Sequence, residues 1–184
     1  MIEITQSLNS KAIYNTRMKK RRPLLLTTAL LLIVTTLLQA KPQFGNAVLF
    51  NDNWRFNLAD TKEGAAPGFD DSKWRVLSLP HDWTVEGTYS PDKASCTGYL
   101  PGGIGWYRKS FTVPADMKDQ KVFIYFEGVY NHSEVYLNGQ LLGKRPNGYI
   151  SFMYDMTPYI KVGQENVIAV RVDHSLERDS RWYS

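Results

Sequence analysis

The sequence predicts an all-β sandwich. Turn residues recur at short intervals after residue 41, and the runs between them are rich in Val, Ile, Tyr, Phe and Trp. No long helical period competes with these runs. The 184 residues are 43% hydrophobic and 13% aromatic, which is enough apolar mass for one domain with a core and excludes a disordered chain.

Residues 1–40 predict an export signal ahead of that domain. The basic stretch Met18–Pro23 precedes an apolar run, Leu24–Leu38, that is shorter than the roughly 20 residues of a membrane-spanning helix. Because a small residue suits a cleavage position, we expect a signal peptide helix cut after Ala40, with Met18 as the true start. The alternative is an uncleaved membrane anchor. Cleavage would give an exported protein, periplasmic or extracellular, with no membrane contact.

The charge distribution argues against a nucleic-acid partner. Although the formal net charge is +4, residues 1–40 hold six of the 22 basic residues and one of the 18 acidic residues. The remainder carries 16 basic and 17 acidic residues, and it therefore lacks the basic surface that phosphate backbones require. The single cysteine, Cys96, has no partner for an internal disulfide.

Several strands can be placed from residue patterns. In Val167–His174, alternate residues are apolar, which predicts one buried face and one wet face. Val122–Tyr130 is apolar on both faces, as in a strand from the middle of a sheet. Glu134–Leu142 contains Asn138-Gly139 and predicts a hairpin with a type I′ turn.

Three further segments complete the expected arrangement. Trp106–Val113 is a strand that Pro114 closes, and Ala47–Phe56 and Trp74–Leu79 are weaker candidates. Thr84–Gly105 has several turn signals and no periodicity, which predicts a long loop.

Residues with catalytic chemistry do not form a recognisable site. Asp70 and Asp71 are adjacent, so their side chains point apart, and we expect a solvated turn in which Asp71 caps the following residues. The histidines at 81, 132 and 174 match no metal-ligand spacing. The sequence therefore predicts no catalytic residue, no metal site and no cofactor in this chain.

Aromatic residues beside polar ones suggest a sugar site. His81-Asp82-Trp83 follows the end of a candidate strand, and Arg181-Trp182 follows Asp179 near the end of the chain. An indole stacks on the apolar face of a pyranose ring, while carboxylates and guanidinium groups bind its hydroxyls. The alternative is that each Trp packs in the core or between domains.

An ordered set of motifs resembles one known family. The set resembles the amino-terminal sugar-binding domain of glycoside hydrolase family 2, particularly exported β-galactosidases of the Bacteroidetes type, over residues 47–184. Its members are Leu79–Trp83, Gly105–Phe111, Phe126–Val129, Val135–Gly139, Asp155–Thr157, Asn166–Val172 and Ser180–Ser184.

The resemblance implies a jelly-roll, galactose-binding-domain-like sandwich over residues 41–184, followed by immunoglobulin-like and TIM-barrel domains. Catalytic glutamates would lie on the barrel. It also implies that the sandwich continues past Ser184, so that the chain is incomplete and inactive alone. Residues that would contact a β-galactoside are Asp82, Trp83, Asp179, Arg181 and Trp182. A free-standing carbohydrate-binding or adhesion module is the alternative.

Overall fold

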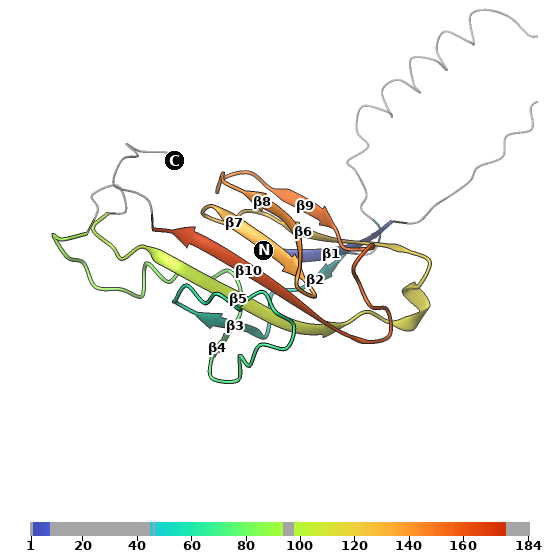
Figure 1. Ribbon diagram of the computed structural model, residues 1–184. Helices are drawn as coiled ribbons and strands as arrows, with labels where there is room; N and C mark the ends of the chain where they lie inside the picture. The colour runs from blue at the N-terminus through green and yellow to red at the C-terminus, as the bar shows by residue number, and fades with distance from the viewer. Residues whose placement is uncertain (1, 8–44, 46, 94–97, 176–184) are drawn as a thin grey trace, which may run out of the picture.

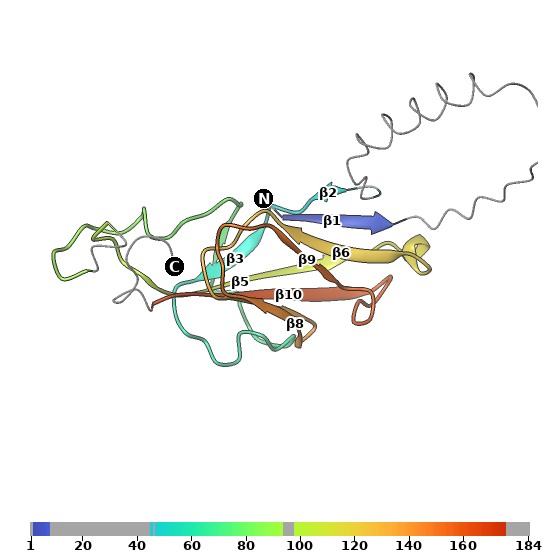
Figure 2. The same cartoon turned by 90° about the horizontal axis from the view of Figure 1, so that it is seen from above.

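The structure is a computed structural model that describes residues 2–7, 45, 47–93 and 98–175. Its strands form two antiparallel sheets that face each other, which Figure 2 shows as two layers. The smaller sheet has the order β2-β1-β6-β9, with β1 Ile2–Ser7, β2 Val48–Leu49, β6 Lys121–Phe126 and β9 Phe152–Asp155.

The larger sheet has six strands, in the order β4-β3-β5-β10-β7-β8 (Figure 1). Their bounds are β3 Trp54–Asn57, β4 Arg75–Leu77, β5 Gly103–Thr112, β7 Ser133–Leu137, β8 Gln140–Arg145 and β10 Glu165–His174. Helix in the described ranges amounts to one 3-10 turn at Ala115–Met117. The predicted all-β sandwich is therefore confirmed.

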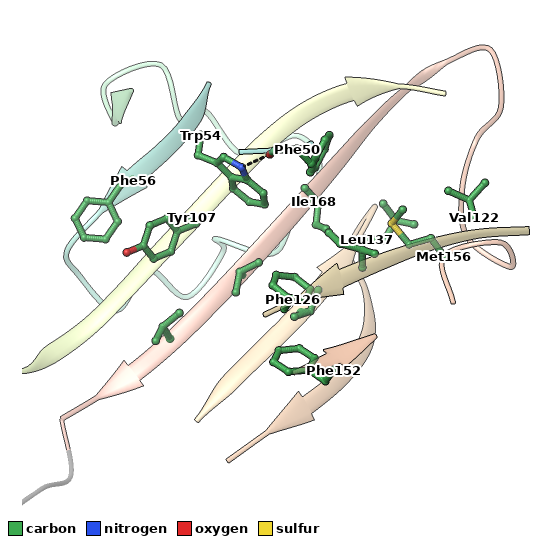
Figure 3. Packing of buried hydrophobic residues seen from close by; sticks show 14 of the residues in the cluster. Phe50, Trp54, Phe56, Tyr107, Val122, Phe126, Leu137, Phe152, Met156 and Ile168 are labelled. Atoms are coloured by element: carbon green, nitrogen blue, oxygen red, sulfur yellow. Dashed lines mark hydrogen bonds between the residues drawn. The ribbon is translucent and has the colours of Figure 1, made fainter. Parts of the chain in front are cut away.

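Alternate residues of both sheets fill the space between them. The inner positions of β6, which are Val122, Ile124 and Phe126, are fully buried, and they belong to one apolar cluster with Ile168 and Val170 of β10. Figure 3 shows members of this cluster, among them Phe126 and Ile168, packed between the strands. The period of two in each strand thus builds a single core.

Trp54 shows how a polar atom enters this core. Its side chain is completely buried, and Nε1 donates a hydrogen bond to the Phe50 carbonyl oxygen at 2.8 Å (Figure 3). The indole therefore contributes its apolar area without leaving a buried donor unpaired.

The predicted hairpin is confirmed at its turn. Asn138 and Gly139 have φ angles of 50° and 82°, both positive as a type I′ turn requires, and they connect β7 to β8. The interior position of β6 is also confirmed, since it lies between β1 and β9. Strand β9, by contrast, was not predicted, because its four residues carry no clear alternation.

The outer face of β10, which was expected to be wet, is partly covered: Arg171 and Asp173 are half-buried and Ala169 is buried. Ala169, on that face, is 1% exposed, and Arg108 on the neighbouring strand β5 is equally buried. The cause is the loop after β3, which folds back over the sheet. A Cβ on Gly64 would lie 2.7 Å from the Trp106 ring, so the loop backbone sits directly on the sheet.

A buried guanidinium holds this loop in place. Arg108 Nε donates to Asp71 Oδ2 at 2.8 Å, and its Nη1 donates to the carbonyl oxygens of Gly64 and Ala66. Asp71 also pairs with Arg55 at 3.3 Å. The expected capping by Asp71 is therefore wrong.

The cap comes from the neighbouring carboxylate. Asp70 Oδ1 accepts the Ser72 backbone N–H at 3.0 Å, and hydrogen bonds from Ser72 lower the Asp70 pKa. The adjacent carboxylates thus have separate structural roles. This agrees with the prediction that their side chains point apart and form no shared site.

We predict that Arg108→Met destabilises the fold by about 3 kcal/mol, because it leaves carbonyl groups and a carboxylate without their buried partner. Urea unfolding followed by tryptophan fluorescence measures this change. The matched control is Lys144→Met, which removes a 61% exposed partner of Glu134 and should cost less than about 1 kcal/mol. Equal losses in the two variants would contradict the role assigned to Arg108.

Candidate functional site

One end of the sandwich contains a cavity of about 410 Å³ between the two sheets. Core residues from both sheets form its base, and three loops form its walls. Its lining comprises Trp54, Tyr107, Phe126, Val170, Val172 and His174 from strands, Leu79–Thr84 from the loop after β4, and Gly128–Tyr130, Gly148 and Tyr149 from the loops around β7 and β8. The opening is thus bordered by loops and backed by the core.

Asp82 presents a carboxylate at this cavity. The residue is exposed, and its Oδ1 accepts hydrogen bonds from the Thr84 backbone N–H at 2.8 Å and the Thr84 hydroxyl at 2.7 Å. This Asx turn fixes the direction of the side chain. Among the described residues, Thr84 binds this carboxylate through Oδ1 alone, so Oδ2 can accept hydrogen bonds from a ligand.

Trp83 packs into the interior next to Asp82. It is 6% exposed, and its ring stacks on Phe56 with centroids 5.8 Å apart. A Cβ on Gly105 would lie 2.9 Å from the indole, so glycine is required there. Trp83 therefore lines the cavity as part of the core, and a sugar contact through it stays a prediction.

His81 joins the cavity wall to a surface ion pair. Its Nδ1 lies 2.8 Å from the Tyr107 hydroxyl, and its Nε2 lies 3.3 Å from Glu86 Oε1. Arg75 donates to Glu86 at 2.9 Å. The hydrogen bond from Arg75 lowers the pKa of Glu86, while burial raises the pKa of Tyr107, so the phenol stays neutral.

Two tyrosines that the sequence analysis missed border the opening. Tyr149 is 66% exposed and Tyr130 is 38% exposed, with ring centroids 5.3 Å apart and planes at 66°. A Cβ on Gly148 would clash with Tyr130 at 2.4 Å, so this glycine permits the approach. The turn signal Asn147-Gly148 beside Tyr149 was the only local indication, and it gives no partner for either ring.

The remaining predicted site residues, Asp179, Arg181 and Trp182, lie outside the described residues, as does Cys96. Among the residues that are described, no three His, Cys, Asp or Glu side chains come together in a group that could hold a metal ion. The structure therefore brings Asp82 and Trp83 to one cavity.

The two antiparallel sheets, with loops that carry aromatic and carboxylate groups at one end, define the class of protein: an antiparallel β-sandwich with a candidate site at its loop end. Residues 105–183 match the family model described as a glycosyl hydrolase 2 galactose-binding domain-like domain. The chain belongs to glycoside hydrolase family 2 and corresponds to the amino-terminal domain of its β-galactosidase-like members.

Known relatives extend well beyond this domain. The chain is 57% identical over 139 residues to the β-galactosidase BoGH2A of Bacteroides ovatus, covering 73% of this chain and 16% of that protein. It is 49% identical to a putative β-glucuronidase of Formosa agariphila, covering 73% and 13% of the respective chains. The crystal structure of a β-glycosidase from Bacteroides vulgatus superposes with a TM-score of 0.71 and 51% identity, over 76% of this chain and 19% of that one.

We predict that Arg75→Met raises the pKa of Glu86 towards its ordinary value, because it removes the hydrogen bond that favours the carboxylate. Carboxyl-carbon NMR titration measures the change. Asp70 is an internal control, since its pKa depends on Ser72 and should not move. An unchanged Glu86 pKa would disprove the assignment of Arg75 as its main partner.

Proposed function

We propose that this chain is the sugar-binding leading domain of a longer, exported family 2 glycosidase that hydrolyses β-galactosides with retention. The observation that carries the proposal is the composition of the cavity. Asp82 is the one carboxylate among its described lining residues, whereas a retaining glycosidase needs two carboxyl groups about 5 to 5.5 Å apart. The reactive pair would come from polypeptide outside this chain, on a TIM barrel that follows an immunoglobulin-like domain.

The domain would position the non-reducing sugar. Asp82 Oδ2 would accept hydrogen bonds from sugar hydroxyls, and the exposed faces of Tyr130 and Tyr149 would pack against the apolar side of the ring. Asp179, Arg181 and Trp182 are proposed as further contacts from the segment after β10. Contacts to this sugar would align its glycosidic bond with the catalytic groups.

We infer that the sugar is a neutral galactoside and not a glucuronide. Relatives of the chain carry both names, but the β-galactosidase BoGH2A is the more similar at 57% identity, against 49% for the putative β-glucuronidase. The exposed Asp82 carboxylate would also repel the carboxylate of a glucuronide. These two observations favour a β-galactoside.

The proposal that the protein is exported rests on the basic stretch and the apolar run in residues 18–40. No helix within the described part of the chain has the length and apolar character to cross a membrane. Amino-terminal sequencing of the protein from culture medium or periplasm would test the cleavage, with Lys41 as the expected first residue.

Two measurements test the proposal directly. The reading frame should continue past codon 184 for several hundred codons, and the 184-residue chain should not hydrolyse nitrophenyl β-galactoside. A stop codon directly after Ser184, together with galactoside binding by the chain in calorimetry, would instead establish a free-standing carbohydrate-binding module. Hydrolysis by the purified chain would contradict both functions.

In the longer protein, we predict that Asp82→Asn raises KM for a β-galactoside about 10-fold, as expected for losing one charge-assisted hydrogen bond to substrate. Steady-state kinetics separate KM from kcat. The matched control is Asp92→Asn, an exposed aspartate of the same loop that does not line the cavity. Equal changes in KM for the two variants would show that Asp82 does not contact the sugar.

A further inference from the structure

The hydroxyl group of Tyr107 lies at the cavity, and its one hydrogen-bond contact within the described residues is to His81. Tyr107 is 7% exposed, and its ring packs on Phe56 with centroids 4.8 Å apart (Figure 3). The hydroxyl oxygen lies 2.8 Å from His81 Nδ1. Which of these two atoms donates the hydrogen decides what the hydroxyl can offer to a ligand.

Arg75 determines the direction of this hydrogen bond. Its Nη2 lies 2.7 Å from His81 Nε2, and a guanidinium N–H can only donate. A neutral His81 therefore accepts at Nε2 and carries its hydrogen on Nδ1, and a protonated His81 carries a hydrogen on Nδ1 as well. In both states Nδ1 donates and the Tyr107 oxygen accepts.

The hydrogen of the Tyr107 hydroxyl is then left without an acceptor among the described residues. Burial raises the pKa of this phenol, so the hydrogen stays on the oxygen. A buried donor usually has a partner, and a donor in a cavity wall can find one in a ligand. The cavity therefore offers a hydrogen-bond donor in addition to the Asp82 acceptor.

This donor and this acceptor are near each other. Besides burial, the negative charge of Asp82 raises the pKa of Tyr107, yet no direct hydrogen bond joins these two described side chains. A single hydroxyl group placed between them can accept from Tyr107 and donate to Asp82 Oδ2. A carboxylate or an ether oxygen cannot do both, because it has no hydrogen to donate.

We propose that Tyr107 is a specificity-determining residue of the sugar site, and that it donates to the same sugar hydroxyl that donates to Asp82. His81 and Arg75 are positioning residues, since they act through Tyr107 by fixing the direction of its hydrogen bond. This inference rests on the proposed function, because it names the group by which the cavity recognises a neutral sugar.

Proton–nitrogen NMR of the full 184-residue chain tests the direction of the hydrogen bond without any sugar. In alkaline solution, where imidazole is neutral, we expect the hydrogen of His81 on Nδ1. Arg75→Met should move it to Nε2, because Glu86 Oε1, 3.3 Å away, is then the acceptor that remains. Lys144→Met, an exposed replacement away from the cavity lining, is the control and should leave the hydrogen on Nδ1. A hydrogen on Nε2 in the unmodified chain would overturn the proposal.

Steady-state kinetics of the longer protein test the sugar contact. We expect Tyr107→Phe to raise KM for nitrophenyl β-galactoside about 5-fold, with kcat changed less than about 2-fold, as for the loss of one neutral hydrogen bond to substrate. The matched control is Tyr154→Phe, which removes a buried hydroxyl that has no hydrogen-bond partner among the described residues and does not line the cavity. KM should not change in that variant.

Monodeoxy galactosides, each lacking one hydroxyl, identify the shared group. For one of them, KM should agree within about 2-fold among the unmodified protein, Tyr107→Phe and Asp82→Asn, because the hydroxyl that both residues contact is absent. Loss of the two effects with different analogues, the same effect of Tyr107→Phe on every analogue, or a rise in KM in only one of the two variants would contradict this proposal alone. An unchanged KM in both variants would overturn the proposed sugar site as well.

Discussion

Burial of the inner faces of β6 and β10 in one apolar cluster is the contact on which the rest of the molecule depends. β10 pairs with β5 along all ten of its residues and with β7 on its other side, so it holds the larger sheet together. Its residues Ile168, Val170 and Val172 join Ile124 and Phe126 in the core. Each loop that carries a candidate functional residue is attached to a strand whose position follows from this contact.

The cavity arises where the core continues into loops. Val170 and Val172 contribute to both the core and the cavity lining, as does Trp83 from the loop after β4. A rigid aromatic base and a short Asx turn thus hold the Asp82 carboxylate in place with little conformational freedom. Such preorganisation reduces the ordering cost of ligand binding.

Both faces of the larger sheet are covered, but by different means. The inner face is covered by apolar side chains, whereas the loop after β3 covers part of the outer face through the Arg108 guanidinium and backbone carbonyl groups. In the smaller sheet, β6 lies between β9 and β1, and β1 comes from residues 2–7. The strands of the larger sheet, by contrast, all come from residues 54–174.

The sequence by itself determined the strands and their local turns. The alternation in Val167–His174 and the Asn138-Gly139 turn were read correctly because each depends on residues within a few positions of one another. For the same reason, the sequence placed Asp82 and Trp83 correctly, directly after a strand. Only the tertiary structure decided that the loop after β3 covers Arg108 on the outer face. The same holds for the shared cavity of Tyr130, Tyr149 and Asp82, and for the pairing of β1 with β6. These results depend on contacts between distant segments, and a local pattern of residues does not indicate which distant segments come into contact.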